Sequence, residues 1–397
     1  MTTDARSRTV PRLRPFASTV FAEMTALAGR YDAVNLGQGF PDTDGPPRML
    51  EVAREAIASG LNQYPPGPGM PVLRHAVADD RRRRYGQDLD PDTEVLVTVG
   101  ATEAISATML ALVQPGDDVL LIEPYYDSYA AAVALAGATR RTVPLVPDGD
   151  GFVLDVDALR AAVTPATRLI VVNSPHNPTG TVLSRAELTA IAEVVVEHDL
   201  IALTDEVYER LVFDDAEHVP LATLPGMADR TITVSSAAKT FNATGWKTGW
   251  ACGPEPLIAA VRTAKQFLTF VGGAPFQPAV AHALTEESAW VESLRTDLQR
   301  KRDLLSAALT DAGFGVKRSA GTYFVCADIA PLGETDADAF CRALPERIGV
   351  VGVPVDAFVD HRESWSTLVR FAFCKQDEVL RDGARRLASV RRADRAD

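Results

Sequence analysis

The sequence predicts an α/β protein with two domains: a large domain around a mostly parallel, helix-covered sheet, and a smaller α/β domain. The chain has 397 residues, which is too long for one simple core and favours two domains. From residue 48 to about 288, short apolar runs alternate with helical patterns, and this alternation is typical of a parallel sheet with helices on its faces. Several of those runs end in loops rich in polar residues, proline and glycine, as strands do at the ligand-binding edge of such a sheet.

The elements follow in chain order. Residues 1–40, with Pro11 and Pro15, are expected to form an extended N-terminal arm that packs with the small domain. Residues 41–288 form the predicted large domain and residues 289–397 the small one. The clearest strands of the large domain lie at 95–97, 119–122, 169–172, 201–203 and 231–234.

A long polar helix pattern over 287–311 leads into the small domain, which contains apolar strands at 323–327 and 368–372. The last stretch, 390–397, is charged and is expected to fray.

The composition excludes some classes of function. The 46% hydrophobic and 23% charged residues are ordinary for a soluble globular protein. A net charge of −13 argues against nucleic-acid binding, which needs clustered basic surface. The run of arginines at 81–84 follows an apolar helical pattern, so we interpret it as a solvated helix face and not as a phosphate site.

Cysteines and targeting signals are uninformative. The four cysteines form no Cys-x-x-Cys pair, so neither a metal site nor a disulfide framework is expected. No apolar run approaches the ~18 residues of a membrane helix, and the N-terminal arginines precede no apolar stretch of the kind that a signal peptide has. We therefore expect a cytoplasmic protein that binds no membrane.

Lys239 is the most informative residue. It lies in a turn of small and hydroxyl-bearing residues that follows the strand at 231–234, and Lys247 comes one short loop later. A lysine at such a turn can be held near a phosphate and partly desolvated. Desolvation makes its ammonium lose the proton more readily, which Schiff-base chemistry with a carbonyl requires. The alternative is a surface turn with two solvated lysines.

Three further segments favour the first interpretation. Residues 173–180 place Asn, two Pro and Gly directly after a buried strand. Asp205 ends the next strand, where a carboxylate is costly unless it meets a cation or a hydrogen-bond donor. Residues 98–105 read as strand, glycine turn and helix start, which aims backbone N–H groups at an anion. Together these segments supply what is needed to hold pyridoxal phosphate as an electron sink.

Gly37-Gln38-Gly39 has the beginning of a dinucleotide-binding glycine loop. Asp42 stands where the third glycine would be. Pro41 and the two prolines at 46 and 47 prevent a helix from following. These departures argue against a nicotinamide-dependent enzyme.

The motifs at 35–42, 62–67, 174–180 and 369–371 resemble those of the class I/II, fold-type I aminotransferases, in the same order along the whole chain. Within that family the chain is similar to the kynurenine and glutamine transaminase branch, and it most resembles the actinobacterial N-succinyldiaminopimelate aminotransferases. The resemblance implies a fold-type I transferase, pyridoxal 5′-phosphate as cofactor, and amino-acid and 2-oxo-acid substrates.

The resemblance also implies roles for individual residues. Lys239 matches the lysine that carries the cofactor and moves a proton at Cα, and Asp205 matches the carboxylate that pairs with the pyridine nitrogen. Asn177 and Tyr208 match residues that hydrogen-bond the ring's phenolic oxygen. Tyr126 matches the aromatic residue stacked on the ring, although a tyrosine there is also compatible with a place in the core.

By the same resemblance, the phosphate meets the backbone of Ala101 and Thr102, the Ser236 hydroxyl, the Lys247 ammonium, and Tyr64 from a neighbouring subunit. The complete cofactor-binding set is Gly100, Ala101, Thr102, Tyr126, Asn173, Asn177, Asp205, Tyr208, Ser236, Lys239, Lys247 and Tyr64.

For the substrate, Arg370 matches the arginine that grips the α-carboxylate, since its planar fork binds both oxygens. Asn177 assists it, Gly39 and Phe21 match positions of the arm that covers the substrate, and Phe270 matches an aromatic residue contributed across a dimer interface. The resemblance therefore implies a homodimer with shared active sites and no metal.

The sequence departs from the family at three places. Ala238 stands where this branch often has glycine, while Phe21 and Val271 stand where kynurenine-preferring relatives carry tryptophan and histidine. The leading hypothesis is an aminotransferase of lysine and diaminopimelate biosynthesis that uses glutamate and makes N-succinyl-LL-2,6-diaminopimelate. A broad kynurenine, glutamine or aromatic transaminase, a carbon–sulfur lyase and, remotely, a pyridoxal-phosphate-binding regulator stay open.

Overall fold

The computed structural model of the protein describes residues 8–390. Its N-terminal part contains a short 3₁₀ helix, η2 (Pro11–Phe16), and a three-turn helix, α1 (Val20–Tyr31). The Thr19 hydroxyl caps α1 by accepting a hydrogen bond from the backbone N–H of the helix's third residue, and Met24 is buried. The expectation of an extended arm is therefore wrong for this part, because one apolar helix face packs on the rest of the protein.

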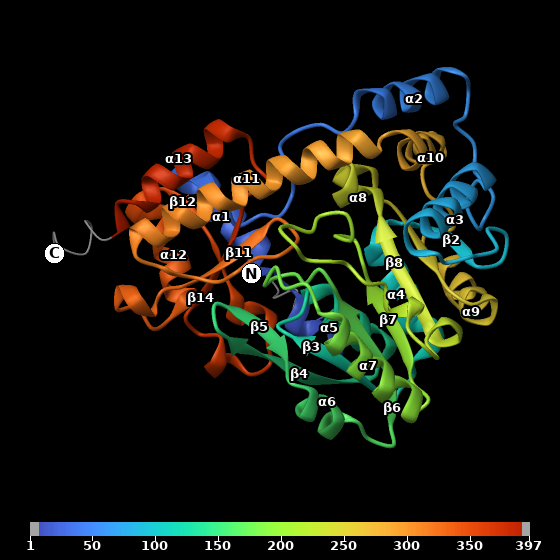
Figure 1. Ribbon diagram of the computed structural model, residues 1–397, viewed down its shortest axis with the longest axis horizontal. Helices are drawn as coiled ribbons and strands as arrows, with labels where there is room; N and C mark the ends of the chain where they lie inside the picture. The colour runs from blue at the N-terminus through green and yellow to red at the C-terminus, as the bar shows by residue number, and fades with distance from the viewer. Residues whose placement is uncertain (1–7, 391–397) are drawn as a thin grey trace.

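An eight-stranded sheet forms the centre of the larger part of the molecule, in the order β2-β9-β8-β7-β6-β3-β4-β5 (Figure 1). Strands β8, β7, β6, β3 and β4 are mutually parallel, and the pairs β2–β9, β9–β8 and β4–β5 are antiparallel. All five expected strands are present, and the mostly parallel sheet is confirmed. The strands are β2 (Val95–Val99), β3 (Asp118–Glu123), β4 (Thr139–Asp148), β5 (Gly151–Leu154), β6 (Thr167–Asn173), β7 (Ile201–Asp205), β8 (Thr231–Ser236) and β9 (Thr248–Cys252).

Both faces of this sheet are buried, because successive side chains of a strand point to opposite sides. Leu121 and Val171 lie on the face covered by α4, α5 and α9, and Leu120 and Ile170 on the face covered by α6 and α7. This explains why the central strands are continuously apolar and not alternating. The covering helices are α4 (Gly100–Leu112), α5 (Asp127–Ala136), α6 (Val156–Ala162), α7 (Arg185–Glu197) and α9 (Glu255–Lys265).

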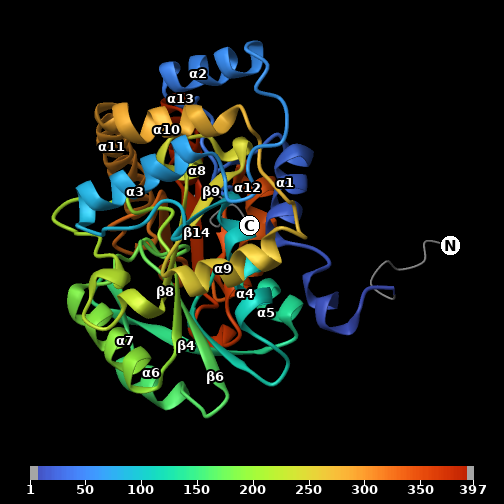
Figure 2. The ribbon, with the colours of Figure 1, turned by 90° about the vertical axis from the view of Figure 1, so that its right-hand side faces the viewer.

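A separate cluster of helices packs near the β2–β9 edge, on the upper right of Figure 1 and in the upper part of Figure 2. Its helices are α2 (Pro47–Ala58), α3 (Pro71–Tyr85), α10 (Phe276–Glu286) and the single-turn α8 (Ala237–Thr240).

The smaller part of the molecule is joined by the 25-residue helix α11 (Ser288–Ala312), which runs between the two parts in Figure 1 and confirms the long polar helix expected at 287–311. The division of the chain into domains at this point stays a prediction. The smaller part has an antiparallel sheet, β10-β11-β14-β13, and a two-stranded pairing of β1 with β12. Its elements are β1 (Val34–Asn35), β10 (Gly315–Val316), β11 (Phe324–Asp328), α12 (Ala337–Ile348), β12 (Val350–Val351), β13 (Val353–Pro354), β14 (Leu368–Ala372) and α13 (Asp377–Leu387).

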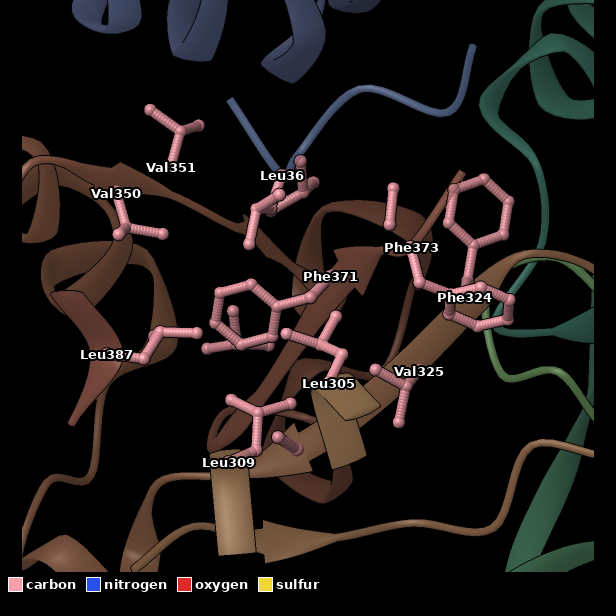
Figure 3. Close-up of a cluster of buried hydrophobic side chains, with 14 of the residues drawn as sticks. Leu36, Leu305, Leu309, Phe324, Val325, Val350, Val351, Phe371, Phe373 and Leu387 are labelled. Carbon is pink, nitrogen blue, oxygen red and sulfur yellow. The ribbon is translucent and has the colours of Figure 1, made fainter. Parts of the chain in front are cut away.

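Apolar side chains from distant segments hold this smaller part together (Figure 3). Leu36, Leu305 and Phe371 are fully buried in one cluster and come from the N-terminal segment, α11 and β14. Each fully buried leucine contributes roughly 1.5–3 kcal/mol. The N-terminal segment is thus a structural part of this core.

Two expectations about charged segments are wrong in part. Arg81, at the start of the four-arginine run, is only 2% exposed, because it forms ion pairs with Glu206 at 2.9 Å and Glu209 at 3.0 Å. The next three arginines do carry exposed side chains. At the other end, Val390 is buried and packs into the apolar core, while the rest of the stretch expected to fray lies outside the described residues.

The four cysteines are free and buried: Cys252, Cys326, Cys341 and Cys374. Among residues 8–390, no helix is both long and apolar enough to cross a membrane.

Candidate active site

A cavity of about 350 Å³ opens where the C-terminal ends of β6, β7 and β8 meet the N-terminal segment and β14. This is the edge of the sheet at which parallel α/β proteins bind ligands. Fourteen of the sequence-predicted site residues line it: Phe21, Gly39, Gly100, Ala101, Thr102, Tyr126, Asn173, Asn177, Asp205, Tyr208, Ser236, Lys239, Lys247 and Arg370.

Lys239 lies in α8, immediately after β8, and its side chain faces the cavity. Its ammonium lies 5.8 Å from the ring centre of Tyr208 and 5.5 Å from that of Tyr323. Burial lowers the pKa of Lys239 to about 8, and the nearby positive charges of Lys247 and Arg370 act in the same direction. A substantial fraction of the amine is therefore unprotonated near neutral pH, as a nucleophile requires.

Asp205 is the last residue of β7 and is 4% exposed. Its Oδ2 accepts a hydrogen bond of 2.7 Å from the Tyr129 hydroxyl, and its Oδ1 accepts one of 3.3 Å from the backbone N–H of Val207. Burial raises the pKa of Asp205 above its ordinary value, although the Tyr129 hydroxyl and the Lys239 charge act in the opposite direction. Among residues 8–390, no basic side chain forms an ion pair with this carboxylate. A positively charged ring nitrogen placed in the cavity would supply that missing charge.

The loop after β6 is tied to β7 by one side chain. Asn173 donates to the backbone carbonyl of Asp205 at 2.8 Å and accepts from the backbone N–H of Asn177 at 2.8 Å. Asn173, which the sequence places with the cofactor-binding residues, therefore also fixes the position of two other site residues. The amide oxygen of Asn177 accepts from Arg370 at 2.9 Å, which leaves its NH₂ group to donate to a ligand.

The start of α4 forms an anion-binding pocket. Ala101 and Thr102 lie in the first helical turn, where backbone N–H groups have no intrahelical acceptor. Gly100 has φ 76°, and a Cβ built on it would lie 3.0 Å from Lys247 Nζ, so a side chain at this position would fill the pocket. Ser236 lies beside them and makes no capping hydrogen bond with its own hydroxyl. Backbone N–H groups, a hydroxyl and an ammonium around a space kept free of side chains fit a phosphate group.

Aromatic rings form two walls of the cavity. Tyr126 lines one wall and packs edge-on against Tyr129, with ring centres 5.7 Å apart, so it is a cavity residue and not only a core tyrosine. Tyr208 lines the other wall and packs edge-on against Tyr323 at 5.1 Å. Burial raises the pKa of Tyr208 above its ordinary value, so its hydroxyl stays protonated and can donate.

Arg370, on β14, is a buried cation without an anion. It is 1% exposed, and among residues 8–390 it pairs with no carboxylate. Nη1 donates to Asn177, Nη2 donates to the carbonyl of Gly37 at 2.9 Å, and Nε has no partner. The guanidinium stacks 4.0 Å from the ring centre of Phe324 and 5.2 Å from that of Phe21. An uncompensated buried charge is costly, and a ligand carboxylate would neutralise it.

The segment that covers the cavity is held by its backbone. The Tyr323 hydroxyl donates to the carbonyl of Gly39 at 2.5 Å, and a Cβ on Gly39 would lie 2.3 Å from the Phe324 ring. A side chain at this position would therefore require the Phe324 ring to move, and the role of Gly39 in covering the substrate stays a prediction.

Tyr64 and Phe270 do not line the cavity of their own chain. Their rings pack edge-on at 5.4 Å on the surface, where Tyr64 is 82% and Phe270 49% exposed. The single chain therefore leaves both predicted partner-supplied residues available at its surface.

Several cavity residues were missed by the sequence analysis. Tyr129 could have been found, because it lies one helical turn after Tyr126 and faces the same way. Phe324 lies at the start of β11, a strand that was identified without a functional role. Gln38 and Thr244 carry no sequence signal that distinguishes them from ordinary loop residues.

The chain is similar to known aminotransferases along nearly its whole length. The family model described as aminotransferase class I and II matches residues 31–387. A probable N-succinyldiaminopimelate aminotransferase of Mycobacterium tuberculosis is 64% identical over 388 residues, which cover 96% of this chain and 98% of that protein. A kynurenine–oxoglutarate transaminase of Dictyostelium discoideum is 37% identical over 401 residues, with 92% of each chain covered. The solved structure of an N-succinyldiaminopimelate aminotransferase from Mycobacterium tuberculosis superimposes with a TM-score of 0.95 at 65% identity, and covers 96% of this chain and 99% of that one.

Proposed function

The chain belongs to the class I and II aminotransferases, and from this premise we propose that it moves an amino group from glutamate to N-succinyl-2-amino-6-ketopimelate, giving 2-oxoglutarate and N-succinyl-LL-2,6-diaminopimelate. The observation that carries the chemistry is the meeting of three groups in one cavity. Lys239 offers a nucleophilic amine, Asp205 a buried carboxylate, and Arg370 a buried guanidinium that pairs with no carboxylate in the described part of the chain.

We propose pyridoxal 5′-phosphate as the cofactor, because the donors of the cavity suit each part of it. The N–H groups of Ala101 and Thr102 with Lys247 suit the phosphate, Asp205 suits the ring nitrogen, and Tyr126 suits the ring face. When bound, the cofactor supplies the electron sink that lets a Cα–H bond of an amino acid break.

The side chains of the protein then have separate tasks. Arg370 binds the substrate α-carboxylate through two parallel charge-assisted hydrogen bonds and so fixes the orientation of Cα. The Lys239 amine, with its lowered pKa, would take the proton from Cα and hold it until it is returned in the second half of the transfer. Asn177 and Tyr208 donate toward the phenolic oxygen of the ring, and Phe21 with the Gly39 segment excludes water from above.

We also propose a homodimer with shared sites. Tyr64, Phe267, Leu268 and Phe270 form an exposed apolar patch, and Tyr64 and Phe267 are 82% and 83% exposed. The patch is rigidly supported, because the buried Lys265 donates to the carbonyl of Phe270 at 2.6 Å. Patches of this kind mark association surfaces, and Tyr64 and Phe270 would complete the cavity of a second copy.

The substrate assignment rests on the relatives and on the room in the cavity. N-succinyl-diaminopimelate is long and carries carboxylates far from the reacting Cα, whereas Arg370 can hold only one. Phe21 is smaller than the tryptophan of kynurenine-preferring relatives. Val271 and the pair Gly272-Gly273 do not line the cavity of their own chain. We propose that, like the adjacent Phe270, they lie at the site of a partner, where they would open room and offer backbone N–H groups.

The test separates transamination from the lyase alternative. With each amino acid as donor, more than one equivalent of keto-acid product per active site should form only when a 2-oxo acid is present, because the amino group must be accepted before the enzyme can turn over again. Release of pyruvate and ammonia from cysteine conjugates without an acceptor would identify a carbon–sulfur lyase and reject the proposal. The kynurenine and glutamine alternative is tested in the same panel.

A further inference from the structure

Tyr129 makes the shortest hydrogen bond to the cofactor-facing carboxylate. It is 3% exposed, and its hydroxyl lies 2.7 Å from Asp205 Oδ2, which is its one hydrogen-bond partner among the described residues. Burial and the adjacent carboxylate raise the pKa of Tyr129 well above its ordinary value, so its hydroxyl keeps its proton and acts only as a donor. Donation to an anionic oxygen is stronger than a neutral hydrogen bond and favours the ionised carboxylate.

The Tyr129 bond matters because Asp205 has few other partners. The backbone N–H of Val207 donates to the second oxygen at the longer distance of 3.3 Å, and no basic side chain of the described residues forms an ion pair with the carboxylate. The titratable groups that face this carboxylate are Tyr126 and Tyr129 from α5, Glu206 and Tyr208 from the turn after β7, and Lys239 from α8.

The two bonds also fix the plane of the carboxylate, because each of its oxygens is held by a different element. The donor is itself supported, since the Tyr126 ring packs edge-on against the Tyr129 ring at 88°. The start of α5 therefore supplies both groups: its N-cap residue Tyr126 forms the ring wall of the cavity, and Tyr129 in its first turn is the donor behind Asp205.

We infer that Tyr129 is a positioning residue: by donating to Asp205 Oδ2 it keeps this carboxylate ionised and oriented toward the cofactor's ring nitrogen. The inference rests on the proposed cofactor. Without the Tyr129 donor, Asp205 would take up a proton more readily and would stabilise a positive charge on the ring nitrogen less. A ring with less positive charge would let the Lys239 nitrogen keep its proton to a higher pH.

The test compares Tyr129→Phe with Tyr125→Phe as a matched control. Tyr125 is also a buried tyrosine that donates to a carboxylate, Asp360 Oδ1 at 2.8 Å, but it does not line the cavity. Three quantities are measured: the Kd of pyridoxal phosphate for the apoenzyme, the pH midpoint of the bound cofactor's visible absorption change, and kcat and KM separately.

For Tyr129→Phe we expect the Kd of the cofactor to rise roughly tenfold or more, as loss of one charge-assisted hydrogen bond predicts. The pH midpoint should move upward, and kcat should fall while the KM of each substrate changes little, because Tyr129 does not touch the substrate. Tyr125→Phe should lower the Tm about as much as Tyr129→Phe does. It should leave the Kd of the cofactor, the pH midpoint and the kinetic constants at wild-type values.

If Tyr129→Phe behaves like Tyr125→Phe, the inference is overturned. If the wild-type protein binds no pyridoxal phosphate, the proposed cofactor and this inference fail together, whereas failure of the inference alone leaves wild-type binding intact. Should Tyr129→Phe not fold, 3-fluorotyrosine at position 129 keeps the ring and strengthens the donor. It should move the pH midpoint downward, and an unmoved midpoint would overturn the inference.

Discussion

At the scale of single residues, Lys239 and Arg370 carry most of the proposed chemistry, and each has a measurable consequence. Because burial lowers the pKa of Lys239 from 10.5 to about 8, the neutral amine fraction rises with pH up to that value and is nearly complete above it. The rate at which apoenzyme captures pyridoxal phosphate should therefore increase about tenfold per pH unit below the pKa and level off above about 8. Lys239→Ala should show no capture, no visible absorption and no turnover. A capture rate that still rises steeply above pH 10 would mean that the amine is not desolvated.

For Arg370→Ala we expect kcat/KM to fall by at least roughly tenfold for every amino acid tried. The α-carboxylate loses charge-assisted hydrogen bonds worth about 1.5–3 kcal/mol each, and 1.4 kcal/mol is a factor of ten. Arg318→Ala is the control, because Arg318 does not line the cavity. A loss confined to one substrate would show that Arg370 binds a side-chain group and not the common carboxylate.

At the scale of secondary-structure elements, the N-terminus of α4 is the feature with the sharpest test. A Cβ at Gly100 would lie 3.0 Å from Lys247 Nζ, and the backbone there has φ 76°. Gly100→Ala should therefore weaken cofactor binding by roughly tenfold or more, because the ammonium must move away from the phosphate. Gly86→Ala is a matched control: Gly86 has φ 68°, yet nothing lies within 4 Å of the added Cβ. If Gly100→Ala and Gly86→Ala raise the Kd of the cofactor equally, backbone strain alone explains the effect at Gly100.

The elements also show where sequence reasoning succeeds and where it stops. The strands of the central sheet were predictable, because burial on both faces makes each one a short continuous apolar run. Helix α1 was missed, since Pro11 and Pro15 suggested an extended chain although both precede the helix. Arg81 was misjudged because its partners Glu206 and Glu209 are 125 and 128 residues away, and only the fold brings these charges together.

Contacts between residues that are distant in the chain also explain what was missed in the site. The residues that we propose to bind the cofactor lie in recognisable motifs at strand ends, so most of the cavity lining was predictable. Tyr129 acts through Asp205, which is 76 residues away in the chain, and a pattern of local spacing contains no trace of that contact. Polar groups that support a site from behind are in general found only once the fold is known.

At the scale of the whole molecule, the proposed dimer predicts complementation. If Tyr64 reaches the phosphate of a partner's site, a Tyr64→Ala chain mixed with a Lys239→Ala chain should form hybrid dimers with one intact site. Activity should then exceed the sum of the two parent variants once subunits have exchanged. Full exchange, shown by mass spectrometry of labelled chains, without any gain of activity would mean that each site is built within a single chain.

The central claim concerns what the enzyme acts on. The most direct measurement is kcat/KM for N-succinyl-LL-2,6-diaminopimelate with 2-oxoglutarate, compared with kynurenine, glutamine and methionine under the same conditions. Differences in pocket volume alone discriminate by about 1–3 kcal/mol, so we expect some activity on the smaller amino acids together with a preference of roughly tenfold or more for the succinylated substrate. If kynurenine or glutamine is preferred by tenfold or more instead, the assignment to diaminopimelate synthesis is wrong and the enzyme is a transaminase of broader specificity.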